Sequence, residues 1–485
     1  MNHLELLRLA FPEVHVAVTA LVVLALGLSK TRSTALCSFI AASGLFLAIV
    51  SLLRLPPEAT LYGGMLVITP LTSLFKIICL TLAIFTVIMA HSDSSSRRHH
   101  GEYLAMILLA TIGLMLLIGS EELLMIFIGL ELTGLSLYVL AGFDKTDPRS
   151  AEAGLKYFLF GSTASAFTLF GLSFIYGMAG STSLAEIGQK LTTGPVQPLL
   201  AAGLVMTLIG FAFKIAAAPF HLWAPDAYQG SPIPSSAFIA SGSKVASFVV
   251  LGKIMLLGLG PIQGSAAWHG LIAGWAPILA ALAALSIVLG NLVALAQTNV
   301  RRLLAYSAVA HAGYTLLGLV AGGRAGFSAT LFYTTTYAFT LLGAFGVVAL
   351  VRRETGGDDF VHFVGLRARS PLLAGCMAIF MLSLAGLPPL AGFFGKFYLF
   401  SAALRADETH GLLWLVVLAL FGSLISLYYY LIVSKLVLVD ESETAIPVAN
   451  ISWLQRLTLL ALAIVVVVLG VLPSALVSRI VASLK

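Results

Sequence analysis

The sequence predicts an all-α polytopic membrane protein, and three observations carry this prediction. The chain of 485 residues is 59% hydrophobic and only 10% charged, whereas soluble proteins usually carry about 25% charged residues. Its mean hydropathy is +1.02, and apolar runs long enough to cross a bilayer as helices recur along its whole length. The runs are continuous and lack the alternation, over about ten residues, that marks the strands of a membrane β-barrel.

About fourteen spans are expected, each with roughly the 20 apolar residues that a transmembrane helix needs. The chain forms one membrane domain, 1–485, because no loop is long enough to fold by itself. The first span, 11–28, lacks a basic leader and a small-residue cleavage site, so we expect it to be retained. The domain divides into three N-terminal helices, a first repeat, a second repeat and a C-terminal helix, at 11–90, 101–257, 271–439 and 452–478.

Basic residues gather on alternate loops, as the pairs Arg97-Arg98, Arg301-Arg302 and Arg352-Arg353 illustrate. On the positive-inside rule these loops are cytoplasmic, and both termini lie on the outer, periplasmic side. The net charge of +6 therefore reports topology, and nucleic acid is not an expected partner.

An internal repeat relates the two halves of the chain. The run Ala166–Gly171 returns almost unchanged as Ala338–Gly343, at an offset of 172 residues. The same offset carries Pro219 to within two residues of Pro389, and the start of the fourth span onto that of the ninth. Five spans fit each unit, spans 4–8 and 9–13, and an odd number of crossings inverts the second unit relative to the first. The sequence thus predicts two inverted five-helix repeats.

Each repeat contains a span that proline interrupts. In the seventh span Pro219 lacks the donor that a helix requires, and in the twelfth Pro388 and Pro389 stand between Gly386 and Gly392. Carbonyls freed at membrane depth need partners from protein or water. A broken helix therefore suggests an internal polar cavity, and a plain proline kink is the alternative.

Four ionisable side chains lie near the middle of apolar spans: Glu131, Lys214, Lys244 and Lys396. A charge at the bilayer centre costs roughly 2.5–3.5 kcal/mol on insertion scales, so such residues are candidates for function. Lys214 stands five residues before the proline break of its span. Lys244 follows small residues that favour close helix packing.

These residue types suit proton transfer. A nearby carboxylate stabilises the charged form of a buried lysine, and separating the two favours proton loss. Lysine can release its proton, whereas arginine stays charged. Moving one proton against 100 mV needs about 2.3 kcal/mol. Bringing a carboxylate close to a buried lysine, or moving it away, can supply a free energy of this size. We therefore predict a proton path through Glu131, Lys214, Lys244 and Lys396; a static ion pair or snorkelling side chains are the alternative.

Weaker candidates accompany these four. His221, just past the break, and His311, within the tenth span, could relay protons or could be hydrogen-bonded core histidines. Lys156 begins the sixth span and could be interfacial, and Glu102 begins the fourth and could be a solvated end residue. Lys76, outside the repeats, could face a partner subunit.

The repeat also predicts an asymmetry. Shifting Lys214 by 172 residues reaches Gly386 and not Lys396, which stands beyond the second break. The two lysines are thus expected on opposite sides of their breaks, which favours a directional path over two copies of one site.

The three cysteines, Cys37, Cys79 and Cys376, lie far apart within apolar runs and form no CxxC pair. An iron–sulfur cluster or a zinc site is therefore not expected in this chain. Small buried side chains are the simpler interpretation.

Several motifs give the chain a family resemblance: Gly129–Leu132 around Glu131, Phe213-Lys214, the run Pro219–Gly230, Ser243-Lys244 and Asn299–Ser307. They resemble the antiporter-like subunits of respiratory complex I, NADH-quinone oxidoreductase, and the resemblance covers nearly the whole chain. Within that family, the run Ser150–Ser162, the length and the lysine at 396 resemble the subunit N branch.

The resemblance implies a proton-translocating subunit of this oxidoreductase in the bacterial inner membrane. Glu131 and Lys214 would be a modulating pair, Lys244 a central relay, and Lys396 the group that exchanges with the outer side. Its partners would be other membrane subunits, including sister antiporter-like subunits, together with the lipid bilayer, protons and internal water. No cofactor is expected in this chain, because NADH, FMN, iron–sulfur clusters and quinone would belong to partner subunits. A subunit of a sodium/proton antiporter or of a membrane hydrogenase is the alternative.

Overall fold

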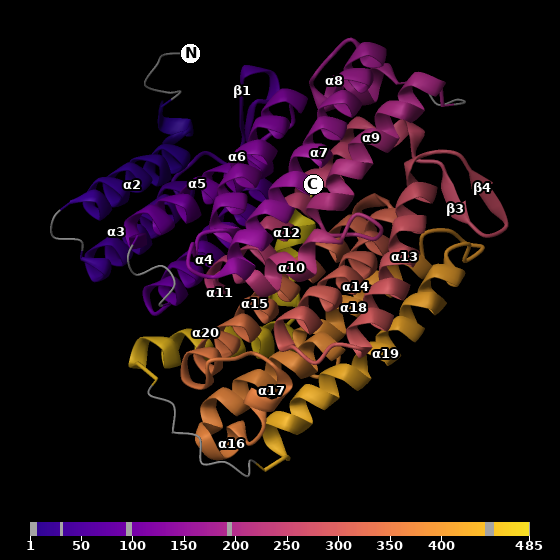
Figure 1. Ribbon diagram of the computed structural model, residues 1–485. Coiled ribbons are helices and arrows are strands. Elements are labelled where there is room, and N and C mark those ends of the chain that lie inside the picture. The colour runs from indigo at the N-terminus through magenta and orange to yellow at the C-terminus, as the bar shows by residue number, and fades with distance from the viewer. Residues whose placement is uncertain (1–6, 30–32, 94–98, 192–195, 442–450, 485) are drawn as a thin grey trace.

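The computed structural model describes residues 7–29, 33–93, 99–191, 196–441 and 451–484 as a bundle of long helices (Figure 1). The predicted helical membrane class is confirmed. Arg97 and Arg98, used above for orientation, lie outside the described residues.

Within the described residues, 12 helical segments are long and apolar enough to cross a membrane. They are α2 (Phe11–Leu28), α3 (Thr34–Leu52), α4 (Pro70–His91), α5 (His100–Gly119), α6 (Leu123–Ala141), α7 (Pro148–Ala179), α11 and α12 (Ile233–Ala240 and Gly242–Lys253, read with the π-turn Ile254–Gly258), α13 (Trp275–Leu295), α14 (Val300–Ala321), α15 (Gly323–Thr355), α19 (Leu413–Leu438) and α20 (Trp453–Val471).

The predicted seventh and twelfth spans are divided into shorter helices. The seventh consists of α9 (Pro198–Lys214) and α10 (Trp223–Gly230), and the twelfth of α17 (Pro371–Ala385) and α18 (Ala391–Leu404). Both spans predicted to be interrupted are therefore broken, and the non-helical segments contain Pro219 in the first and Pro388 and Pro389 in the second. The total of fourteen spans and the inverted repeats stay predictions.

Short elements decorate the ends of the bundle. The hairpin β1 (Ala59–Leu61) and β2 (Leu66–Ile68) pairs Ala59 with Ile68, and β3 (Ser265–Ala267) and β4 (Gly270–Ile272) pair Ser265 with Ile272. Both hairpins and α8 (Leu184–Lys190) lie toward the upper end in Figure 1, and α16 (Leu366–Arg369) lies toward the lower end. The amphipathic α21 (Ser474–Ser483) closes the chain.

The helices α11, α12, α14 and α15 form the centre of the bundle, where nearly every residue is buried. Three buried threonines on α15 are satisfied within their own helix: Thr330, Thr334 and Thr340 each donate to the carbonyl four residues before. Such local hydrogen bonds let hydroxyls lie at membrane depth without an external partner.

One break was not predicted. Ser241 has non-helical angles, φ −111° and ψ −80°, and separates α11 from α12. The eighth span, predicted over 233–257, is present as one apolar segment, Ile233–Gly258, but it is kinked at Ser241. The Ser241-Gly242 pair could have predicted this break from the sequence, because Gly/Ser pairs are a known cause of helix kinks. Lys244 therefore lies in the first turn of a new helix.

Two buried ion pairs join helices inside the bundle: one links α2 to α4, and the other links the end of α12 to the connection between α5 and α6. The Lys76 ammonium lies 2.7 Å from Oε1 of Glu13 and is 2% exposed. Lys253, at the end of α12, lies 3.1 Å from Oε1 of Glu121 and donates to the carbonyl of Ile118 at 3.0 Å. The suggestion that Lys76 faces a partner is wrong, because its charge is neutralised inside this chain.

We expect Lys76→Met to destabilise the protein by about 3–5 kcal/mol, because it leaves the Glu13 charge buried without a partner. The change is measured by heating the detergent-solubilised complex and monitoring the temperature at which this subunit is released. The double variant Glu13→Leu, Lys76→Met should recover most of the loss, and Lys145→Met, on an exposed loop, should have none. A double variant as unstable as the single one would contradict the explanation.

Candidate functional site

The first broken helix ends at a lysine. Lys214 is the last residue of α9, so the break begins directly after it and not five residues later at Pro219, as the sequence suggested. Ala216 has a φ of +58°, which turns the chain away from the helix axis. A cation at the C-terminal end of a helix is stabilised by the helix dipole and the free carbonyls there. The break therefore provides an environment for the Lys214 ammonium.

Side chains from elsewhere satisfy the backbone that this break frees. The amide of Ala218 donates to Oγ of Ser286 on α13 at 2.8 Å. The indole of Trp223 donates to the carbonyl of Phe213 at 3.0 Å. These two bonds show why the helix can end before the proline: partners distant in the sequence take over its hydrogen bonds.

Glu131 and Lys214 lie near each other but do not form an ion pair. Neither of these two described residues has the other within the 4.0 Å limit of a salt bridge. Instead, Glu131 accepts a hydrogen bond from Ser165 on α7. A Cβ at Gly134 would lie 3.6 Å from Nζ of Lys214, so this glycine leaves room for the ammonium. Glu131 and Lys214, the predicted modulating pair, therefore lie close together without a direct ion pair between them.

Lys244 is held by a neutral oxygen. Its ammonium donates to the carbonyl of Ala308 on α14 at 2.7 Å and lies 5.6 Å from the centre of the Tyr337 ring. The residue is 3% exposed, and none of the ion pairs among the described residues includes it.

Lys396 folds back across the second break. Its ammonium donates to the carbonyl of Ala385, the last residue of α17, at 3.0 Å and to Oγ of Ser423 on α19 at 2.8 Å. Gly386, with a φ of +86°, ends α17, and a Cβ there would lie 3.3 Å from Nζ of Lys396. The lysine therefore occupies the C-terminal end of a broken helix, as Lys214 does.

This placement qualifies the asymmetry that the sequence suggested. Gly386 is the position that the offset of 172 residues assigns to Lys214, and the Lys396 ammonium lies beside it. Although Lys396 stands beyond its break in the sequence, its charged end returns to the equivalent place. Lys214 does precede its break and Lys396 does follow its break in the chain, as predicted, but the Lys396 ammonium returns to the end of the preceding helix, and the directional path stays a prediction.

His311 lies between the second and third lysines. Its Nδ1 lies 2.6 Å from the hydroxyl of Tyr333, and its Nε2 lies 2.9 Å from that of Tyr430. Its ring centre is 4.7 Å from that of Tyr337, the ring beside Lys244. Both ring nitrogens thus have hydroxyl partners.

Tyr314 completes the connection to Lys396. Its ring centre is 5.7 Å from that of His311 and 5.3 Å from Nζ of Lys396. Its hydroxyl accepts a hydrogen bond from Asn291 at 2.9 Å. Lys244, Tyr337, His311, Tyr314 and Lys396 therefore form one contiguous buried series.

The sequence analysis missed these tyrosines. Their signal was spacing: Tyr314 follows His311 by one helical turn, and Tyr333 and Tyr337 are four residues apart on one face of α15. Such spacing alone does not identify a site in so apolar a chain. The tyrosines are recognised as part of the site only because the structure places His311 against α15.

Several buried polar atoms in this region have no partner among the described residues. They include Nδ1 of His221 and the hydroxyls of Tyr157, Tyr228 and Tyr337. Buried polar groups are normally hydrogen-bonded, and internal water is their ordinary partner where the protein offers none. The His221 ring centre is 6.3 Å from that of Tyr306.

The two remaining candidates lie apart from this series. Lys156 forms 2.6 Å ion pairs with Glu152 and with Asp226 on α10, and Arg302 lies 2.9 Å from the same aspartate. Lys156 thus joins a charged network where α7, α10 and α14 meet. Glu102 pairs with His99 at 3.0 Å in the first turn of α5, half-exposed, and the structure does not bring it to the other charges.

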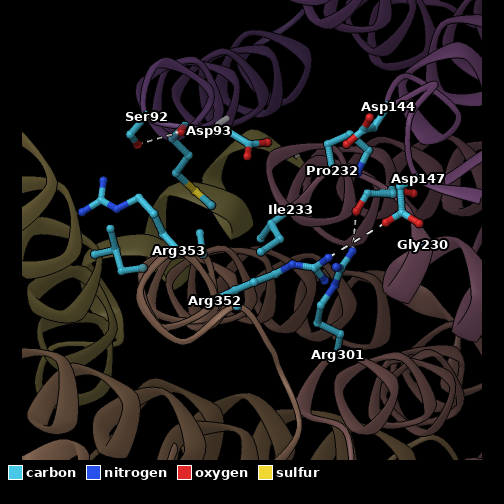
Figure 2. A pocket seen from close by; sticks show the side chains of 15 residues that line it. Ser92, Asp93, Asp144, Asp147, Gly230, Pro232, Ile233, Arg301, Arg352 and Arg353 are labelled. Carbon is cyan, nitrogen blue, oxygen red and sulfur yellow. Dashed lines mark hydrogen bonds and ion pairs between the residues drawn. The ribbon is translucent and has the colours of Figure 1, made fainter. Parts of the chain in front are cut away.

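A polar cavity of about 260 Å³ opens at the end of the bundle where α10 ends and α14 begins. Arg301 and Arg352 converge there near Asp147 and Gly230 (Figure 2). Arg301 is 1% exposed and lies 3.3 Å from Oδ2 of Asp358, which also takes Arg352 at 3.1 Å. Burial by itself would raise the pKa of Asp358, but Arg301, Asn299 and Arg352 together hold it below its ordinary value. The charged residues that line the cavity are three aspartates and three arginines, Asp93, Asp144, Asp147, Arg301, Arg352 and Arg353, so its positive and negative charges are balanced.

Comparison with known proteins gives a consistent answer. Residues 120–426 match the family model described as NADH:quinone oxidoreductase/Mrp antiporter, TM. NADH-quinone oxidoreductase subunit N 2 of Acidobacterium capsulatum is 44% identical over 98% of both chains. Subunit N of Moorella thermoacetica is 38% identical over 97% of this chain and 96% of that one.

Solved structures agree. A chain of respiratory complex I from Thermus thermophilus with bound aureothin matches with a TM-score of 0.82 and 34% identity, over 97% of this chain and 100% of that one. A chain of the archaeal membrane-bound sulfane sulfur reductase matches with a TM-score of 0.85 and 25% identity, over 99% and 98%. The resemblance stated from the motifs is confirmed: this chain belongs to the antiporter-like membrane subunits of NADH-quinone oxidoreductase, in the branch of subunit N.

Proposed function

We propose that this chain translocates protons through Lys214, Lys244, His311 and Lys396 while partner subunits transfer electrons from NADH to quinone. The observation that carries the proposal is the buried series from Lys244 to Lys396, in which each lysine is held by neutral oxygens. A lysine paired with a buried carboxylate leaves an uncompensated charge when it loses its proton. A lysine held by carbonyl and hydroxyl oxygens leaves none, so it can alternate between its two protonation states.

Glu131 supplies the controlling charge in this proposal. It lies on α6, whose outward face exposes Ile128 (45%) and Leu135 (52%), so it is close to a surface that neighbouring subunits can contact. Moving the Glu131 carboxylate toward Lys214 would stabilise the charged lysine, and moving it away would favour release of the proton. At about 4 Å and an effective dielectric constant of 20, such a pair is worth about 4 kcal/mol. This exceeds the roughly 2.3 kcal/mol needed to move one proton against 100 mV.

His311 provides the transfer between Lys244 and Lys396. A neutral imidazole has one donor and one acceptor nitrogen, and the Tyr333 and Tyr430 hydroxyls can serve either. Accepting a proton on one side and releasing it on the other therefore keeps both nitrogens hydrogen-bonded. Nδ1 of His221 and the Tyr337 hydroxyl, which have no hydrogen-bond partner among the described residues, would bind the internal waters that bridge Lys214 to Lys244.

The rest of the assembly follows from the same proposal. NADH, FMN, iron–sulfur clusters and quinone would bind other partner subunits. The sister antiporter-like subunits, which would hold none of these cofactors, would be this chain's neighbours in the membrane. Lys156 and Glu102 stay weaker candidates at the ends of their helices. We place the chain in the bacterial inner membrane with both termini on the outer side, as the distribution of basic residues favours. A sodium/proton antiporter or hydrogenase subunit is not favoured, because the relatives matched over nearly the full length are named as subunits N.

We expect Lys214→Arg to lower NADH-driven proton pumping severalfold, as Lys214→Ala should, because arginine keeps the charge but does not release its proton. Acidification of inverted membrane vesicles, measured beside NADH oxidation and the amount of assembled complex, tests this. Lys145→Arg, on an exposed loop, is the matched control. Normal pumping by an assembled Lys214→Arg complex would show that the residue serves only as a fixed charge.

We expect His311→Gln to lower pumping at least about tenfold, since glutamine retains hydrogen bonds to Tyr333 and Tyr430 but does not carry a proton at neutral pH. The same vesicle assay applies, with His269→Gln on an exposed loop as the control. If His311→Gln pumps as well as the unsubstituted complex, the path does not pass through the imidazole.

A further inference from the structure

A second cavity, whose lining includes none of the residues of the proposed proton path, opens where α14 ends and α15 begins. It has a volume of about 560 Å³ and is bounded by the start of α15, the end of α18 and the terminal helix α21. This volume is in the range of small-molecule sites. Because successive helices alternate in direction, this groove lies at the same end of the bundle as the start of α2, which the predicted topology places outside.

The groove carries positive charge without a protein counter-charge. Arg324, from the first turn of α15, and Arg405, directly after α18, both line it, and both are exposed. Neither arginine forms an ion pair with a described residue, and no described lining residue is acidic. Asp407, nearby in the sequence, is engaged in its own turn, where its carboxylate accepts from the amides of Thr409 and Gly411.

The remaining lining adds neutral donors and an apolar wall. The Gln263 amide and the Ser401 hydroxyl lie at the polar part, and Phe332, Tyr398 and Val477 provide apolar surface. A pair of arginines beside hydroxyl and amide donors matches a phosphate group, which guanidinium groups bind in a bidentate manner. Apolar surface in the same cavity, at the end of a membrane helix bundle, matches acyl chains.

We propose that this groove binds an anionic glycerophospholipid of the outer leaflet, with its phosphate between Arg324 and Arg405 and its acyl chains against Phe332 and Val477. The charge argues for an anionic headgroup, and the adjoining apolar wall argues for a lipid over a free phosphate ion. A zwitterionic lipid is disfavoured, because its own ammonium group would lie beside two uncompensated arginines.

The test uses the whole purified complex in nanodiscs that contain a trace of photoactivatable phosphatidylglycerol. We expect illumination to label peptides at the start of α15 and the end of α18, and the double variant Arg324→Gln, Arg405→Gln to reduce this labelling by on the order of tenfold. Arg54→Gln, an exposed arginine outside the groove, is the matched control and should leave the labelling unchanged.

Two further arms decide the source of the phosphate. Photoactivatable phosphatidylcholine should label these peptides much less, and millimolar inorganic phosphate should not compete. Equal labelling by phosphatidylcholine, labelling unaffected by the double variant, or no labelling of the groove in the intact complex would each overturn the proposal. Full competition by inorganic phosphate would assign the groove to a free anion instead.

Discussion

The structure depends on one constraint: three ammonium groups buried among membrane helices must be stabilised without being permanently neutralised. Carboxylates would neutralise them, as Glu13 does for Lys76. The lysines of the path are instead placed at helix ends or on carbonyls. Lys214 ends α9, Lys396 donates to the last carbonyl of α17, and Lys244 donates to a carbonyl of α14. Free carbonyls at membrane depth are costly, and so are cations without counter-ions. Here the free carbonyls and the ammonium groups stabilise each other.

The same constraint explains the breaks and the polar centre. A continuous helix would offer no free carbonyl at the depth of Lys396, so Gly386 and the prolines after it are part of the lysine's environment. Ser286 and Trp223 take over the backbone groups at the first break. Around His311, tyrosine hydroxyls provide partners that can both donate and accept, which a proton carrier needs. Fixed charges are kept at the ends of the helices, where Asp358 is paired with Arg301 and Arg352.

Much of this architecture was predictable from the sequence, because bilayer thickness, proline chemistry and the cost of buried charge act locally. The helices, the two proline breaks and the buried lysines follow from those rules. What depends on distant contacts did not follow. The first break begins at Lys214 because Ser286, on another helix, receives the amide of Ala218. Lys396 returns to Ala385 because of its side-chain path, which the linear offset to Gly386 does not reveal. The kink at Ser241 and the tyrosines had local signals that are too common in membrane helices to be specific.

The central claim is that these lysines carry protons because their partners are neutral, and one pair of variants tests it directly. Ser423 is a neutral partner of Lys396: its hydroxyl oxygen accepts a hydrogen bond from the Lys396 ammonium at 2.8 Å. Ser423→Asp would place a carboxylate there and hold the lysine charged, whereas Ser423→Asn adds similar bulk without charge. The measurement is the number of protons pumped per NADH oxidised in inverted vesicles. The account predicts that Ser423→Asp loses most of the pumping by this subunit and that Ser423→Asn retains it; equal pumping by the two variants would contradict it.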